Sequence, residues 1–151
     1  ATLEDGLFIH IARGQQPQRP IEVLHLTTAS EQAVLAQTRC LVLLEAGARA
    51  TLVEHFHGTG PQPYFNNGLS EIVLQDDAVL EHYRLQEESP AAFHLHSLFV
   101  NQQARSHYRN SGYALGGATA SVAVSEGSST TPLPLSSRPF PRGRFRSNRS
   151  P

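Results

Sequence analysis

The sequence predicts an all-β fold built of stacked coils. A short apolar run, a polar turn and a second short run recur in three passes between residues 41 and 115. Each turn contains an alanine, and these alanines recur at a similar spacing along the chain: Ala48, Ala78 and Ala104. Repeats of about 20–50 residues are typical of solenoid proteins. Strand-forming residues and turns dominate elsewhere, and only residues 29–38 form a run of good helix formers.

The N-terminal part contains two expected strands. Residues 6–14 (GLFIHIARG) form a β-rich run bounded by glycines, which indicates a strand. After a polar turn with two prolines, residues 21–27 (IEVLHLT) alternate with a period of two, as a half-buried strand does. Residues 29–38 (ASEQAVLAQT) fit either a helical turn or a loop between strands.

The three repeats supply the remaining strands. Residues 40–44 are a continuous apolar run expected as a buried strand, and Gly47 in the following turn can adopt a positive φ. The composition of residues 58–67 (GTGPQPYFNN) predicts a loop. The other expected strands are 51–57, 68–74, 79–85, 92–100 and 105–115.

Two architectures fit this pattern, an antiparallel sandwich and a parallel β-solenoid. Only the solenoid explains the recurring alanines, because stacked coils would place Ala48, Ala78 and Ala104 in register at a tight corner. We therefore predict the solenoid.

The strand pattern breaks near Ala118. Residues 121–151 contain eight serines and five of the ten prolines, a composition typical of disordered segments. We expect a β-helix core at 1–118 and a disordered tail at 119–151. A change of reading frame near Ala118 is the alternative explanation for the break.

The charge is unevenly distributed. Residues 1–120 contain seven arginines and twelve acidic residues, whereas residues 121–151 contain five arginines and one acidic residue. The acidic body gives no reason to expect a nucleic-acid partner, because phosphates require a basic face. No apolar stretch approaches the roughly 18 residues that a spanning helix needs, so we expect no membrane partner.

Neither the single cysteine nor the acidic pairs predict catalysis. Cys40 begins an apolar run, and we expect it to pack as a small hydrophobic residue. One cysteine excludes an intrachain disulfide and a cysteine-rich metal site made by this chain alone. The acidic pairs 76–77 and 87–88 are expected to be solvated turn residues rather than a general acid and base.

The eight histidines raise the question of a metal site. Residues i and i+2 of a strand share a face, so the sequence contains two same-face pairs: His55 with His57, and His94 with His96. In a stack these pairs could meet His82 and His107, and imidazoles so placed can bind zinc or iron(II). A metal-dependent enzyme is therefore the alternative function. Because we find no HExxH motif and no carboxylate at a fitting offset, we assign no catalytic, cofactor or metal residue.

Three blocks resemble the SufB/SufD family of SUF iron–sulfur cluster assembly proteins, and SufD more than SufB. They are residues 5–28 (DGLFIHIARGQQPQRPIEVLHLTT), 44–56 (LEAGARATLVEHF) and 110–118 (NSGYALGGA). The resemblance implies an incomplete right-handed parallel β-helix. It also implies a non-catalytic scaffold subunit in the cytoplasm that pairs with a SufB-like subunit and docks a SufC-like ATPase. The family's ATPase-docking region and its cluster-handling histidine and cysteine lie C-terminal to the matched part. No site residue therefore carries over, and the full complex would handle the cluster.

Overall fold

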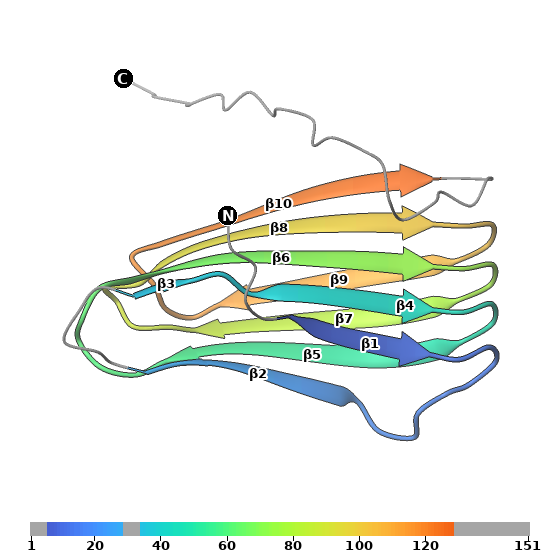
Figure 1. The fold of residues 1–151 in the computed structure, drawn as a ribbon, viewed down its shortest axis with the longest axis horizontal. Coiled ribbons are helices and arrows are strands. Elements are labelled where there is room, and N and C mark those ends of the chain that lie inside the picture. Colours follow the sequence, from blue (N-terminus) through green and yellow to red (C-terminus); the bar gives the residue numbers. More distant parts are fainter. Residues whose placement is uncertain (1–5, 29–33, 129–151) are drawn as a thin grey trace.

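The computed structural model describes residues 6–28 and 34–128, and every regular element within them is a β-strand (Figure 1). The strands are β1 (Leu7–Ile11), β2 (Ile21–Thr27), β3 (Val34–Ala36), β4 (Arg39–Leu44), β5 (Arg49–Gly58), β6 (Tyr64–Leu74), β7 (Val79–Glu87), β8 (Phe93–Gln102), β9 (His107–Ala114) and β10 (Thr119–Ser128). Within these ranges the structure contains no helix with the length and apolar character that crossing a membrane requires.

The strands form two facing parallel sheets. One has the order β1-β4-β6-β8-β10, with β3 also paired to β6, and the other has the order β2-β5-β7-β9. Every pair of neighbouring strands is parallel. A coil consists of one strand from each sheet, joined by a tight turn at one end and a longer return loop at the other (Figure 1). The prediction of a parallel β-solenoid is confirmed, and the antiparallel sandwich is excluded.

The tight turns are stacked and share one backbone geometry. In each turn the fourth N–H donates to the first carbonyl, at 3.0–3.2 Å. The third residue has a positive φ, which is the pattern of a type II turn. Glycine fills this place in the first two turns, whereas Asp77 (φ 60°) and Arg105 (φ 57°) fill it in the next two. These two side chains form a bidentate ion pair at 2.7 Å across neighbouring turns.

The corner predicted for the three alanines is right for two of them. Ala48 and Ala78 are fully buried at the same place in successive coils. Ala104 is not at this corner, because the Asp77 N–H donates to its carbonyl, and Ser106 takes the place equivalent to Ala78. The register explains the error. Arg49 lies opposite Val79, and Val79 in turn lies opposite His107, so the second of these offsets is two positions shorter than the first.

The interior is apolar at the tight-turn end and polar at the return-loop end. Leu44, Leu52, Leu74 and Leu80 are at most 1 % exposed in the apolar half, where alternate residues of each strand point inward. Further along the same strands the inward residues become polar. We call this second group the interior polar cluster: His25, Glu54, Asn66, Ser70, His82, Arg84, Gln86, Glu88, His94 and His96.

Two expectations about connecting segments need correction. Within residues 29–38, for which a helical turn or a loop was expected, Val34–Ala36 is strand β3, paired with Tyr64–Asn66 of β6, while residues 29–33 lie outside the described residues. The loop expected at 58–67 is shorter, because β6 already begins at Tyr64. Pairing with β3 explains why residues 64–66, which have a loop-like composition, form part of a strand.

A further strand follows the core end that was expected at Ala118. Strand β10 follows directly and pairs in parallel with β8 along its whole length, from Thr119 opposite Phe93 to Ser128 opposite Gln102. A change of reading frame near Ala118 stays a hypothesis, which translation of the coding sequence in the other frames tests. The rest of the expected tail, 129–151, lies outside the described residues.

Candidate functional site

The interior polar cluster is centred on the carboxylate of Glu54, which β5 points into the solenoid. Glu54 is 1 % exposed. Its two oxygens face imidazoles from the neighbouring coils, His25 Nε2 of β2 at 3.2 Å and His82 Nε2 of β7 at 2.8 Å. Arg84 Nε lies 3.8 Å away. One buried acid thus holds together side chains from three successive coils.

The electrostatics of this group favour an ionised Glu54. Burial alone would raise the pKa of this carboxyl, but hydrogen bonds from His25 and His82 lower it well below its usual range. Burial lowers the pKa of Arg84, because it disfavours the charged guanidinium, and the negative charge of Glu54 opposes this shift. The buried charge of Arg84 therefore depends on the buried charge of Glu54.

A second buried carboxylate, Glu88, lies directly after β7. It accepts hydrogen bonds from Asn66 Nδ2 and from Gln86 Nε2, the latter at 2.8 Å. His94 Nδ1 lies 2.9 Å from Glu88 Oε2, at ion-pair distance but outside hydrogen-bond geometry. Burial raises the pKa of Glu88, but His94 and the two amides lower this pKa by more than burial raises it, so the net shift is downward. Glu88 is 5 % exposed, so the prediction that it is a solvated turn residue is wrong.

His94 and His96 stack on one another inside the solenoid, with ring centroids 5.9 Å apart. His96 Nε2 is hydrogen-bonded to Ser70 Oγ at 3.0 Å, and burial together with the charge of Arg84 lowers the pKa of His96 to about 3. The ring packs so closely on β6 that a Cβ at Gly68 would clash with His96 Nδ1. His96 is therefore neutral, enclosed and tightly packed on its neighbours.

Cys40 faces the same interior but is not activated. It is 5 % exposed, and burial, reinforced by the charge of Glu54, raises its pKa to about 12. A thiol with that pKa is protonated at neutral pH and is a poor nucleophile. Its packing in the apolar core agrees with the structural role expected from the sequence.

A second histidine group lies on the outer face of the solenoid. His55 and His57 point outward from β5, and Glu87 points outward from β7 directly opposite His57. His55 Nε2 lies 2.8 Å from Glu87 Oε2. One donor atom from each of the three side chains lies within 4.8 Å of the other two. This is the one group of three possible metal-ligating side chains found in the described part of the chain.

The structure separates the two histidine pairs that the sequence suggested might meet. His55 and His57 lie outside the wall, whereas His94 and His96 are 3 % and 1 % exposed inside it. His82 joins Glu54 in the interior, and His107 is exposed at the start of β9. The expected convergence with His82 and His107 is therefore wrong.

Sequence reasoning missed both carboxylates that matter most, Glu54 and Glu87. Glu54 lies at an inward position between Leu52 and Phe56, a visible sign that it is buried. Glu87 follows His57 at the same spacing at which Ala78 follows Ala48. Applying that spacing to the histidines would have found the carboxylate that appeared to be missing.

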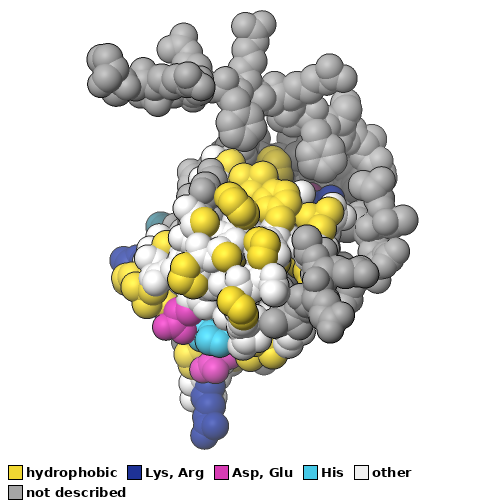
Figure 2. All heavy atoms as spheres, turned by 90° about the vertical axis from the view of Figure 1, so that its left-hand side faces the viewer, with side chains coloured by type: hydrophobic (Ala, Val, Ile, Leu, Met, Phe, Trp, Pro, Cys, Tyr) yellow, Lys and Arg dark blue, Asp and Glu magenta, His cyan; other side chains and the backbone are white. Residues whose placement is uncertain are grey.

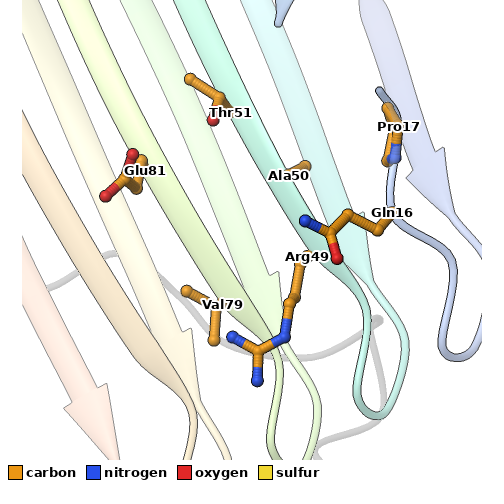
Figure 3. Close-up of a pocket in the computed structure, with 7 residues that line it drawn as sticks. All are labelled: Gln16, Pro17, Arg49, Ala50, Thr51, Val79 and Glu81. Atoms are coloured by element: carbon orange, nitrogen blue, oxygen red, sulfur yellow. The ribbon is translucent and has the colours of Figure 1, made fainter. Parts of the chain in front are cut away.

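The outer face also carries a hollow of about 190 Å³ at the tight-turn end of β5 and β7 (Figure 3). It is lined by Gln16, Pro17, Arg49, Ala50, Thr51, Val79 and Glu81. This lining includes neither histidine nor cysteine, and the hollow lies at the opposite end of β5 and β7 from His57 and Glu87. At the return-loop end, apolar side chains gather on the surface, and acidic and histidine side chains lie below them (Figure 2).

Comparison with known proteins identifies the family. The family described as "SUF system FeS cluster assembly, SufBD core domain" matches residues 25–126. The chain is 32 % identical over 117 residues to an iron–sulfur cluster assembly SufBD family protein of Synechocystis, covering 72 % of this chain and 26 % of the relative. It is 32 % identical over 110 residues to the chloroplastic protein ABCI7 of Arabidopsis thaliana, covering 69 % of this chain and 23 % of the relative.

The iron–sulfur cluster assembly protein SufD of Escherichia coli is 33 % identical over 88 residues, which cover 57 % of this chain and 21 % of the relative. The chain thus spans about a quarter of the length of the curated relatives it matches. No solved structure matches it. The family match ends within β10, beyond the break expected at Ala118. On the family match and these relatives, the chain belongs to the SufB/SufD family of the SUF iron–sulfur cluster assembly system.

Proposed function

We propose that this chain is a non-catalytic scaffold segment of a SufBCD-type complex that assembles iron–sulfur clusters. In this role it pairs with a SufB-like subunit, in a cytoplasmic complex that also contains a SufC-like ATPase. Membership of a family with a role in iron–sulfur cluster assembly is the observation that carries the proposal.

The chemistry of the described residues supports a scaffold rather than an enzyme. The single thiol is buried and protonated, and the carboxylates of the interior are held by fixed partners rather than aimed at a cavity. A general base must reach the proton it removes from a substrate. Glu54 and Glu88 are 1 % and 5 % exposed, so an external substrate has no access to either.

The test is co-purification. The full chain is produced together with the SufB-like and SufC-like proteins of the same organism and separated by size-exclusion chromatography. We expect the three chains to elute together, and we expect the iron and sulfide bound by the complex to fall when this chain is left out. An unrelated β-solenoid of similar size is the control. The proposal is wrong if the folded chain elutes alone while the other two proteins associate.

The second candidate is a metal-dependent enzyme, and one observation favours it. The outward group His55, His57 and Glu87 combines two imidazoles and a carboxylate, a ligand set used by catalytic zinc and iron(II) sites. An enzyme also needs a substrate pocket beside the metal. The hollow in Figure 3 lies at the far end of the same strands, so metal binding is better supported than metal catalysis.

A further inference from the structure

The parallel register of β5 and β7 builds a group of three potential ligands on the outer wall. Within β5, His55 and His57 share the outward face because side chains alternate along a strand. The register then places Glu87 of the next coil directly opposite His57. Three ligands from two coils are thus positioned by backbone hydrogen bonding rather than by a loop.

The spacing of the donor atoms suits a small divalent ion after modest side-chain rotation. Zinc binds imidazole nitrogen and carboxylate oxygen at about 2.0–2.2 Å, so the ligand atoms of a tetrahedral site lie roughly 3.3 Å apart. The three donor atoms here lie within 4.8 Å of one another, and His55 Nε2 lies 2.8 Å from Glu87 Oε2. Binding requires the distance between His55 Nε2 and Glu87 Oε2 to lengthen by about half an ångström.

The side chains are free to make that movement and open to solvent. The side chains of His55 and Glu87 are 32 % and 41 % exposed. The ring of His57 makes an edge contact with the ring of His55, at 5.7 Å between centroids. Exposed Leu24 and Leu26 of β2 lie opposite His55 and His57 and give the group an apolar border. With three protein ligands, at least one coordination position faces solvent.

We propose that His55, His57 and Glu87 bind one divalent transition-metal ion, such as zinc, on the outer wall of the solenoid. This inference goes beyond the scaffold function and does not depend on it. On binding, the ion replaces the hydrogen bond between His55 and Glu87. The proton that His55 Nε2 donates in that hydrogen bond must leave this nitrogen, either to solvent or by a change to the tautomer protonated on Nδ1, because only an unprotonated nitrogen can be a ligand.

The experiment is a zinc titration of the full, tag-free chain by isothermal titration calorimetry. Cobalt(II) absorption provides a second measurement that reports the ligand set. We expect one zinc ion per chain, and His57→Gln and Glu87→Gln should each weaken binding about tenfold or more. The matched control is His10→Gln. His10 Nε2 lies 3.0 Å from Glu45 Oε1, which gives a surface histidine–carboxylate pair without a second histidine.

The titration results either support or overturn the proposed zinc site. Saturable one-to-one binding that both site variants weaken and His10→Gln leaves unchanged supports the site. The proposal is overturned if no saturable uptake occurs, if the site variants bind as the parent does, or if His10→Gln weakens binding equally. Denaturant unfolding of each variant without metal shows that it is folded, and either site variant alone suffices if the other does not fold. Failure of the metal site would leave the co-purification result unaffected.

Discussion

Replacing Glu54 by glutamine tests the central claim about the interior polar cluster. The amide can still accept a hydrogen bond from His25 or His82, but it carries no charge. Arg84 is 6 % exposed and has Glu54 as its partner at 3.8 Å. Glu54→Gln therefore leaves a buried guanidinium without a compensating charge, while the volume of the side chain hardly changes.

The magnitude follows from burial. Removing one partner of a buried ion pair typically costs about 3–5 kcal/mol. A domain of this size is stable by about 5–15 kcal/mol, so the variant should lose a large part of its stability. Glu81→Gln is the matched control, because Glu81 pairs with Arg109 at 3.6 Å and both side chains are exposed, at 41 % and 73 %. A surface pair of this kind is worth about 0–1 kcal/mol.

The assay is urea unfolding of both variants and the parent, with the free energy of unfolding extrapolated to water. The double variant Glu54→Gln with Arg84→Met should recover much of the loss, because it removes the unpaired buried charge while the amide still accepts a hydrogen bond from His82. This recovery keeps the test informative if Glu54→Gln does not fold. If Glu54→Gln and Glu81→Gln cost the same within about 1 kcal/mol, the buried charge of Arg84 does not depend on Glu54.

Three further predictions concern stability. The folded-state pKa of His96 is about 3, below the ordinary value of 6.5, so the unfolded chain binds more protons between these values. The contribution of His96 to the free energy of unfolding is complete above about pH 6.5 and is smaller by about 2 kcal/mol at pH 5. Denaturant unfolding should show this loss in the parent and not in His96→Gln. Gly68→Ala should cost about 1–3 kcal/mol by crowding His96, whereas Gly112→Ala, with open space around its Cβ, should cost nothing measurable in the same assay. Gly47→Ala meets no neighbouring atom but requires φ +70°, so it should cost about 1–2 kcal/mol, and Gly47→Asn should cost less; equal costs would contradict the turn geometry.

Local periodicity was enough to predict most of the strands and their stacking, but not β3 or β10. Alternation in residues 21–27 and the apolar run at 40–44 identified β2 and β4, because inward and outward positions alternate whatever the neighbouring coil is. The tight turn at Ala48 followed from its glycine and from the recurrence of the pattern at Ala78. These features depend on residues close together in the chain, which a sequence displays directly.

What the sequence did not show depends on register between coils. Ala104 was placed at the wrong corner because the offset between neighbouring coils shortens by two positions after Val79, a change that no local pattern marks. The wall that separates the two histidine pairs is likewise not visible in the sequence. The polar neighbours of Glu88 in the chain predict a solvated residue, whereas Asn66 and His94 from other coils enclose it.

The register of β5 and β7 also links the interior polar cluster to the three outward ligands His55, His57 and Glu87. A slip of β7 against β5 by two residues would keep the same side chains inward, so alternation alone does not exclude it. Such a slip would carry either His82 or Arg84 away from Glu54 and leave buried charge less well paired, which is costly. It would also change the residue opposite His57, now Glu87. The buried ion pairs therefore select the register that brings the three outward ligands together. A variant that weakens the pairing of Glu54 should also lower the affinity of His55, His57 and Glu87 for zinc.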